Sequence, residues 1–329
     1  MGSSIVFVSS NYRDLYVEDI YRALGLPKGF VIQYRYRIKN IDENILAKLK
    51  YMRDKEGVIF YCYDPSDKAQ YHGDIKQCDE KVFIPIRKVK FIDYSRSEET
   101  EQINFFLELH EFIDIETDVQ GSLNNLMAME NNVGEIEIKT IKKVSWLKKV
   151  ESIENYFKEV NFFYVNDIAG KLSMKYEPTE KKANLILYDE SIYTLNVLTY
   201  DKSEGQGFID IVTEGEYLNL NDTLEKGTKL NSKTLTVDTR PIDFRKDRTY
   251  LELKDTNSKF GVKMSVTIKK RFKRSFWFGG LSSLALFGFQ FSNLIIKNNL
   301  TWENTGWLLS AAILVALGVS GLHWRYNQK

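Results

Sequence analysis

Two long apolar runs near the C-terminus constrain this chain more than any other feature. They cover residues 276–296 and 306–324, and neither contains an Asp, Glu, Lys or Arg side chain. Because about 20 apolar residues in a helix cross a hydrocarbon core of about 30 Å, each run can span a membrane. The alternative, two buried helices of a soluble domain, fits less well because such helices usually keep a polar face. The sequence therefore predicts a C-terminal transmembrane α-helical hairpin.

Basic residues beside the two runs predict their orientation. Arg325 and Lys329 follow the second run, whereas the loop between the runs carries only Lys297 as a basic residue. A basic collar precedes the first run: Lys269, Lys270, Arg271, Lys273 and Arg274. Since basic flanks stay in the cytoplasm, both chain ends are expected on the cytoplasmic side of a bacterial inner membrane that the chain crosses twice. The collar is expected to contact the headgroups of anionic lipids in this bilayer.

The residues before the collar form a large acidic head. Residues 269–329 contain 8 Lys and Arg and 1 acidic residue, so residues 1–268 carry 38 basic and 44 acidic side chains, a net charge of −6. This charge disfavours direct binding of nucleic acid. Only Cys62 and Cys78 are present, which suits a reducing compartment better than a disulfide framework. The head is expected to be cytosolic and to hold two domains.

Residues 1–118 alternate strand and helix patterns, which predicts an α+β domain for sensing or binding. In residues 29–39, apolar and cationic side chains alternate, as in a half-buried strand with one cationic face. Pro85 interrupts a later strand and predicts a sheet edge or a bulge. Other strands are expected at 5–8, 58–63, 81–93 and 103–115, helices at 11–24 and 41–55, and a loop at 64–80. These elements predict a small curved or barrel-like sheet with one or two helices.

Residues 119–268 predict a mainly β, sandwich-like domain. The Asn- and Gly-containing segment 117–132 marks the boundary before this domain. A helix predicted at 145–159 could belong to either of the two domains. Short strand patterns follow, separated by Gly, Asn and Asp. The last strand alternates from Val262 to Lys269 and enters the collar without a Gly, Pro or Ser-rich linker. A movement of this domain is therefore expected to be transmitted directly to the first membrane helix, because no flexible linker separates them.

Recognisable catalytic motifs are missing from the sequence. It contains neither a Walker loop, nor a dinucleotide-binding glycine loop, nor a His-Glu-x-x-His helix. Cys62, His72 and Cys78 lack the spacing of a compact zinc site, and a Cys62–His110 nucleophile pair has no local support. The sequence thus predicts a protein that is not an enzyme and has no metal site or cofactor. An enzyme with an unrecognised fold, such as a nuclease, is the alternative.

The most informative polar residues of the head are three arginines. Arg35 and Arg37 share one face of the strand at 29–39, and Arg87 lies on another strand. If these strands are neighbours, the three guanidinium groups converge on a phosphate or carboxylate, and Tyr34 and Tyr36 offer rings for stacking. The alternative is a solvated strand face paired with nearby acids.

The first apolar run carries a polar stripe on one helical face. At 100° per residue, its members share one line: Gly279, Ser283, Leu286, Gln290, Asn293 and Lys297. Unpaired amides in lipid are costly, so Gln290 and Asn293 need partners. One interpretation is a packing seam against the small residues of the second run, which include Ser310 and Ala312. The other is a seam that faces other subunits or water in an assembled pore.

This order of parts, a cytosolic β-rich head joined to a transmembrane helix pair, resembles the two-helix membrane effectors of bacterial anti-phage defence systems. The resemblance covers overall organisation. It implies a homo-oligomer that disrupts the inner membrane when the head senses a nucleotide signal, another ligand or a protein partner. A second hypothesis is a membrane-tethered adaptor that presents its β-rich domain to a partner protein.

Overall fold

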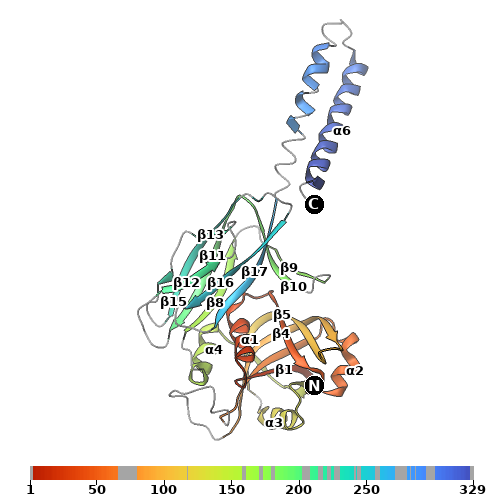
Figure 1. Cartoon of the computed structure of the whole chain (residues 1–329). Coiled ribbons are helices and arrows are strands. Elements are labelled where there is room, and N and C mark those ends of the chain that lie inside the picture. Colours follow the sequence, from red (N-terminus) through yellow and green to blue (C-terminus); the bar gives the residue numbers. More distant parts are fainter. Residues whose placement is uncertain are drawn as a thin grey trace.

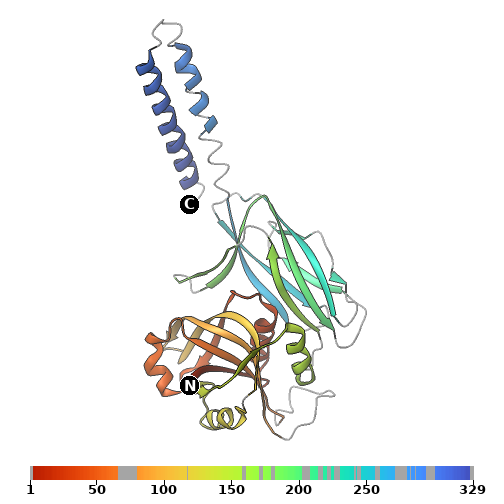
Figure 2. The same cartoon turned by 180° about the vertical axis from the view of Figure 1, so that it is seen from behind.

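A computed structural model of the chain shows three parts in a row (Figure 1). The N-terminal unit and a second, β-rich unit lie next to each other, and helices near the C-terminus project from the far end of the second unit (Figures 1 and 2). The structure describes residues 3–65, 80–116, 118–157, 161–169, 173–178, 182–201, 208–213, 218–220, 224–225, 230–240, 242, 246–255, 260–270, 280–281, 283–285, 287–293 and 301–326. The expected loop at 64–80 lies mostly outside this described part.

A mixed sheet with strand order β2-β5-β4-β3-β1-β6 forms the N-terminal unit, and β7 pairs with β5. The strands are β1 (Ser3–Ser10), β2 (Val31–Arg37), β3 (Glu56–Tyr63), β4 (Val82–Ser97), β5 (Gln102–Ile115), β6 (Val133–Glu137) and β7 (Ile141–Lys143). β1 and β3 are parallel, whereas β6 is antiparallel to β1. A parallel bridge between Ile41 and Val133 brings the two ends of this strand order together. The sheet therefore curves so that the segment after β2 meets β6.

The alternation predicted for the second strand is present in β2. Ile32, Tyr34 and Tyr36 are buried, while Arg35 and Arg37 are exposed. The strand ends at Arg37, two residues earlier than expected, because the chain turns there into the 3-10 helix η1 (Ile38–Asn40). The expected bulge lies opposite β3, where the register shifts between Ile59 and Phe60. β4 is an inner strand between β3 and β5, so the edge position also considered for Pro85 is wrong.

Helices cover the N-terminal sheet and connect it to the rest of the chain. They are α1 (Asp14–Gly25), α2 (Glu43–Lys48) with the 3-10 turn η2 (Leu49–Tyr51), α3 (Gln120–Ala128), and α4 (Trp146–Ile153) with η3 (Glu154–Tyr156). α1 is amphipathic, and its buried face includes Val17, Ile20, Tyr21 and Leu24. The helix predicted at 41–55 is shorter than expected and breaks into α2 and η2. Since β6 and β7 belong to the first sheet, that sheet draws on residues beyond the predicted boundary at 118.

The second unit consists of strands in two sheets. Its strands are β8 (Asn161–Ala169), β9 (Ser173–Glu177), β10 (Lys182–Tyr188), β11 (Ser191–Asp201), β12 (Phe208–Thr213), β13 (Leu218–Leu220), β14 (Leu224–Glu225), β15 (Leu230–Thr239), β16 (Lys246–Asp255) and β17 (Gly261–Lys269). One sheet has the order β14-β12-β16-β17-β10-β9 and the other β13-β15-β11-β8. Leu195 and Leu235 of the second sheet and Val262 and Met264 of the first belong to one continuous hydrophobic core. The described part of the chain is thus mostly β-sheet.

Helix α1 also belongs to this shared core and contacts the second unit. The Tyr21 ring stacks on Phe162 of β8 and on Phe260 just before β17, with centroid distances of 5.3 Å in both pairs. At the end of α1, Gly25 lies against Val262 of β17. Burial of one large side chain stabilises a fold by about 1.5–3 kcal/mol, so these contacts join the two units firmly.

One described helix near the C-terminus is long and apolar enough to cross a membrane. This helix is α6 (Trp302–Tyr326), and its apolar segment Glu303–Leu322 has a mean hydropathy of 1.8 with only 6% of that segment buried. Of the first apolar run, residues 280–281, 283–285 and 287–293 are described, and they are helical. They run beside α6 in both views (Figures 1 and 2). This gives one candidate span rather than the expected pair.

Candidate functional site

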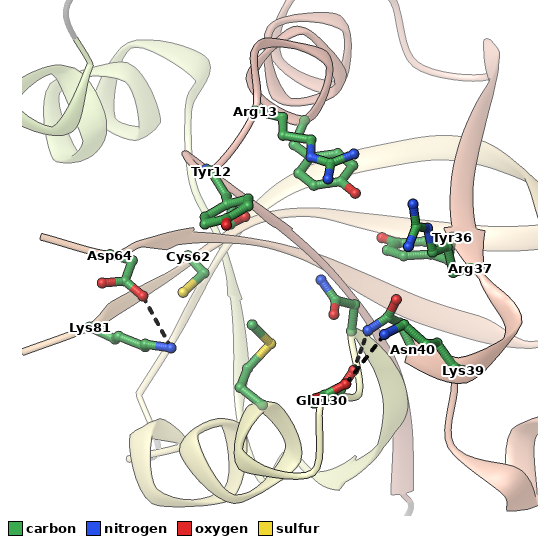
Figure 3. A pocket seen from close by; sticks show the side chains of 14 residues that line it. Tyr12, Arg13, Tyr36, Arg37, Lys39, Asn40, Cys62, Asp64, Lys81 and Glu130 are labelled. Carbon is green, nitrogen blue, oxygen red and sulfur yellow. Dashed lines mark hydrogen bonds and ion pairs between the residues drawn. The ribbon is translucent and has the colours of Figure 1, made fainter. Parts of the chain in front are cut away.

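A pocket of about 470 Å³ lies in the N-terminal unit, where β1 and β3 reach their carboxyl ends (Figure 3). Its walls come from β1, the start of α1, the end of β2, η1, β3 and the segment before β6. The lining residues are Ser10, Tyr12, Arg13, Tyr16, Tyr36, Arg37, Lys39, Asn40, Cys62, Asp64, Lys81, Met127, Glu130 and Asn132. A volume of this size suits one small molecule.

The pocket opens because β6 covers only part of the β1 edge. The pairing of these two strands ends at Phe7 and Val133, so Ser9 and Ser10 extend beyond β6. On the other side, β1 stays paired with β3 up to Ser10 and Cys62. Ligands of α/β sheets commonly bind outside the carboxyl ends of parallel strands, which is where this pocket lies.

Side-chain hydrogen bonds fix the chain at the pocket rim. The Asn11 amide donates to the Asp64 carbonyl at 3.0 Å and accepts from the Asp64 N–H at 2.8 Å. This reciprocal pair ties the residue after β1 to the residue after β3. The Tyr12 N–H donates to the Ser10 hydroxyl at 3.4 Å. The chain therefore leaves β1 in a defined direction, and it places Tyr12 and Arg13 on the pocket wall (Figure 3).

Positive charge dominates the pocket wall. Four cationic and two acidic side chains line it, although the head as a whole is acidic. Lys81 pairs with Asp64 at 3.1 Å and Lys39 pairs with Glu130 at 3.7 Å. Arg13 and Arg37 make no ion pair with any residue that the structure describes. These two guanidinium groups are thus available to an anion.

The hydroxyl of Tyr36 is a buried polar group that faces the same pocket. Tyr36 is only 7% exposed, and its hydroxyl has no hydrogen-bond partner among the described residues. Burial raises the pKa of Tyr36 well above its usual value, so the group keeps its proton. The side chain of Ser9 opposes this rise but does not meet the geometry of a hydrogen bond. An unsatisfied buried hydroxyl costs about 1–3 kcal/mol, which a ligand could recover.

The start of α1 lies at this wall and adds the positive end of the helix dipole. Arg13 is the N-cap residue, and its side chain makes no capping bond. The first N–H groups of a helix lack partners within the helix and carry a partial positive charge. Tyr16, in the first turn, also lines the pocket.

The five residues predicted for the ligand site are only partly brought together. Tyr36 and Arg37 line the pocket, but Tyr34 does not, because its buried hydroxyl donates to the Asp19 carbonyl at 3.1 Å. Arg35 is exposed outside the pocket, where its Nε donates to the Asn104 side chain at 3.3 Å. The expected convergence of Arg35, Arg37 and Arg87 is therefore wrong.

Arg87 is a structural residue in the core. It is fully buried, and its guanidinium group donates to the carbonyls of Ala23 at 2.9 Å, Leu26 at 2.7 Å and His110 at 2.5 Å. The Phe112 ring lies 4.3 Å from it and the Tyr164 ring of β8 lies 5.8 Å from it. Burial lowers the pKa of Arg87 to about 10, so it stays charged at neutral pH. β5 lies between β4 and β2, which separates Arg87 from the strand that carries Arg35 and Arg37.

The pocket does not have the features of a nucleophilic site. Burial raises the pKa of the Cys62 thiol to about 12, so the thiol is neutral at physiological pH. Within the described residues, no group of three or more His, Cys, Asp or Glu could hold a metal ion. His72 and Cys78, considered above with Cys62, lie outside the described part of the chain.

Only part of the predicted polar stripe can be placed. The Ser283 hydroxyl donates to the carbonyl of Ala312 in α6 at 2.7 Å, which fits the packing-seam interpretation at this position. Gln290 is exposed and Asn293 is half-buried. Gly279, Leu286 and Lys297 lie outside the described residues, as do the collar residues Arg271, Lys273 and Arg274. Lys269 ends β17, and Lys270 follows it.

Several pocket residues were missed by the sequence reasoning. Tyr12 and Arg13 lie in the first turn of the helix predicted at 11–24, soon after the strand predicted at 5–8, and this placement at a helix start was the available signal. Lys39 and Glu130 are far apart in the sequence, and they are brought together by the bridge between Ile41 and Val133 and by hydrogen bonds between the neighbouring residues.

Comparisons with known proteins do not assign the chain to a family. No family model and no curated protein matches it. Among solved structures, it is similar to the SrpA adhesin of Streptococcus sanguinis and a mutant of it, at 12% and 16% identity, with 32% and 26% of this chain and 58% and 53% of those chains covered. A titin Ig tandem is 10% identical, with 82% of this chain and 95% of that chain covered. The chain spans about half the length of the adhesin structures. All three TM-scores are 0.18, too low to carry an argument.

Proposed function

We propose that this protein is a membrane-anchored cytosolic sensor of bacterial anti-phage defence. In this proposal, the head binds a ligand or protein partner, and the C-terminal helices form a multi-pass hairpin in the inner membrane with both chain ends in the cytoplasm. Binding would promote assembly of the hairpin into a homo-oligomer that disrupts the membrane. The defence role comes from the resemblance in organisation given above.

Exposed apolar side chains support the membrane anchor. Along α6, Leu309, Ile313, Leu314, Leu317 and Leu322 are each more than half exposed. Apolar surface in water costs about 25 cal/mol per Å², so a helix with this surface needs a lipid or protein environment. The Ser283–Ala312 hydrogen bond supports a paired arrangement of the two helical segments.

The observation that carries the sensor proposal is the path from the pocket to the membrane segment. α1 begins at the pocket wall with Arg13 and ends against β17 at Gly25. β17 then ends at Lys269, and the described helical residues of the first apolar run begin at residue 280. We interpret the two sheets of the second unit as a β-sandwich, whose stiffness would carry a displacement of α1 along β17.

A domain exchange tests this proposal. Residues 271–329 are replaced by an unrelated two-helix anchor of the same orientation, and both proteins are produced in a bacterial host at equal levels. Membrane depolarisation is followed with a voltage-sensitive dye. The proposal expects depolarisation with the native hairpin and none with the exchanged anchor. Equal depolarisation in both strains would contradict it.

A membrane-tethered adaptor is the second candidate, and the exposed surface of the second unit is what favours it. Among the strands that the structure describes, β9 lies at one edge of its sheet, and sheet edges can add a strand from a partner. An adaptor should retain partner recruitment after the anchor exchange, because only its location depends on the hairpin.

A further inference from the structure

We propose that the pocket at the ends of β1 and β3 binds a small phosphorylated molecule that carries a flat ring, of the nucleoside monophosphate class. This inference deepens the proposed function, on which it rests for its biological meaning, by naming the chemistry that the head senses. The residues that line the pocket support the binding site itself.

Two arginines without an acidic partner indicate where a phosphate would bind. Arg13 and Arg37 enter the pocket from α1 and β2, and neither is neutralised by a described acidic side chain. Guanidinium groups match phosphate oxygens with two parallel hydrogen bonds, so a pair of them favours phosphate. The start of α1, a helix of 12 residues whose N-cap residue Arg13 lines the pocket, adds the partial positive charge of a helix N-terminus to this wall.

A second, independent observation also indicates a ligand. The Tyr36 side chain lines the pocket and is buried to more than nine-tenths, and its hydroxyl, which is closed to solvent, has no hydrogen-bond partner among the described residues (Figure 3). Folded proteins rarely leave such a donor unpaired. A phosphate held between Arg13 and Arg37 would supply the missing acceptor after a small side-chain shift that opens the hydroxyl to the pocket.

The ring position follows from the tyrosines at the rim. Tyr12 is 59% exposed although it lines the pocket, and Tyr16 lies one helical turn further on the same wall. An exposed aromatic ring beside a cationic pocket offers a stacking surface for a base or another flat ring. The volume of about 470 Å³ admits a molecule of the size of one nucleotide.

Calorimetric titration of the full chain in lipid nanodiscs tests this inference. The probes are AMP and UMP, the matching nucleosides, phenyl phosphate and inorganic phosphate. We expect at least one nucleotide to bind with Kd below about 1 mM, and its nucleoside and inorganic phosphate to bind about tenfold or more weakly. Phenyl phosphate should bind more tightly than inorganic phosphate because it adds a ring.

Matched variants locate the site. Arg13→Gln together with Arg37→Gln should weaken nucleotide binding about tenfold or more, whereas Arg35→Gln, two residues from Arg37 but outside the pocket, should change it less than about twofold. Tyr36→Phe removes only the hydroxyl and keeps the packed ring, so it should weaken binding about three- to tenfold while the fold is retained. Thermal unfolding of each variant confirms that it is folded.

Three results would overturn the inference. They are no binding of any phosphorylated probe up to about 5 mM, equal affinity for nucleotide and inorganic phosphate, or equal losses in Arg35→Gln and the double pocket variant. The titration is independent of membrane disruption. If nucleotide binds but the membrane is not depolarised, the nucleotide site stands and the proposal of membrane disruption is wrong. If the membrane is depolarised but no nucleotide binds, membrane disruption stands and the nucleotide site is wrong.

Discussion

Gly25 lies so close to Val262 that residue 25 has no room for a side chain. A Cβ at this position would lie 2.2 Å from Val262 Cγ2 and 2.9 Å from the carbonyl oxygen of Phe163. The backbone at the end of α1 therefore lies directly against the Val262 side chain of β17 and the Phe163 backbone of β8 in the second unit. This contact joins the pocket-bearing unit to the strand that leads toward the membrane.

Gly25→Ala should destabilise the head because either the helix or β17 must move. Overpacking of a tight core costs about 1–3 kcal/mol, and we expect a loss of this size in urea unfolding. Gly121→Ala in α3 is the control, since no atom lies within 4 Å of its added Cβ. Replacing a helical glycine by alanine in open space should be neutral or slightly stabilising. Equal losses in the two variants would contradict the close contact.

Arg87→Lys should destabilise the head although it conserves the charge. A lysine is a point charge, so it cannot reach the carbonyls of Ala23, Leu26 and His110 together as the guanidinium group does. Loss of buried hydrogen bonds from a charged donor should cost about 2–4 kcal/mol in chemical unfolding. Arg35→Lys, on an exposed strand face, should cost less than about 0.5 kcal/mol. Similar costs for both would show that the Arg87 contacts contribute little.

Asp19 should make the stability of the head depend on pH. Burial raises the pKa of Asp19 from 3.8 to about 7, despite its ion pair with Arg22 at 3.1 Å. Between these values the folded state holds a proton that the unfolded state has released, so stability falls as the pH rises from about 4 to about 7 and then levels off. The full effect is up to about 4 kcal/mol.

Asp19→Asn removes this titrating group and provides the test. The free energy of unfolding of the wild type minus that of Asp19→Asn should decrease between pH 4 and about 7 and stay constant above that range. Urea unfolding at a series of pH values measures it. A difference that is independent of pH would mean that Asp19 is ionised in the folded protein at acidic pH.

Ser283→Ala should weaken the pairing of the two C-terminal helical segments. Its hydroxyl donates to the Ala312 carbonyl, and a hydrogen bond between helices in a membrane contributes about 0.6 kcal/mol on average. Ser292→Ala is the control, because the Ser292 hydroxyl bonds to Gly288 within its own segment. Reversible unfolding in mixed micelles compares the two. A loss confined to Ser292→Ala would contradict the pairing.

Local sequence patterns predict local structure well in this chain. The alternation in residues 29–39 identifies the buried and exposed faces of β2, because a strand directs successive side chains to opposite faces. Pro85 identifies a bulge because proline cannot donate to the strand ladder. The apolar composition of residues 306–324 identifies a candidate membrane span, although the second expected span is not shown.

Contacts between residues far apart in the sequence determine the site, and the sequence alone did not predict them. Arg87 looks like a surface cation in sequence, but the fold buries it beneath the carbonyls at the end of α1. Conversely, Arg13 lines the pocket next to the point where Asn11 ties the end of β1 to Asp64 after β3. These contacts span many residues, so neither periodicity nor spacing indicates them.

Dye release from liposomes measures whether the C-terminal hairpin disrupts a membrane. The purified full chain is reconstituted into vesicles at increasing protein-to-lipid ratio and compared with a Gln290→Leu/Asn293→Leu variant that inserts to the same extent. Gln290 is exposed and Asn293 half-buried among the described residues of the first apolar run, so both can contact neighbouring subunits, and we expect release by the wild type and about tenfold slower release by the variant. Equal release by both proteins, or no release by either at any ratio, would contradict membrane disruption by this hairpin.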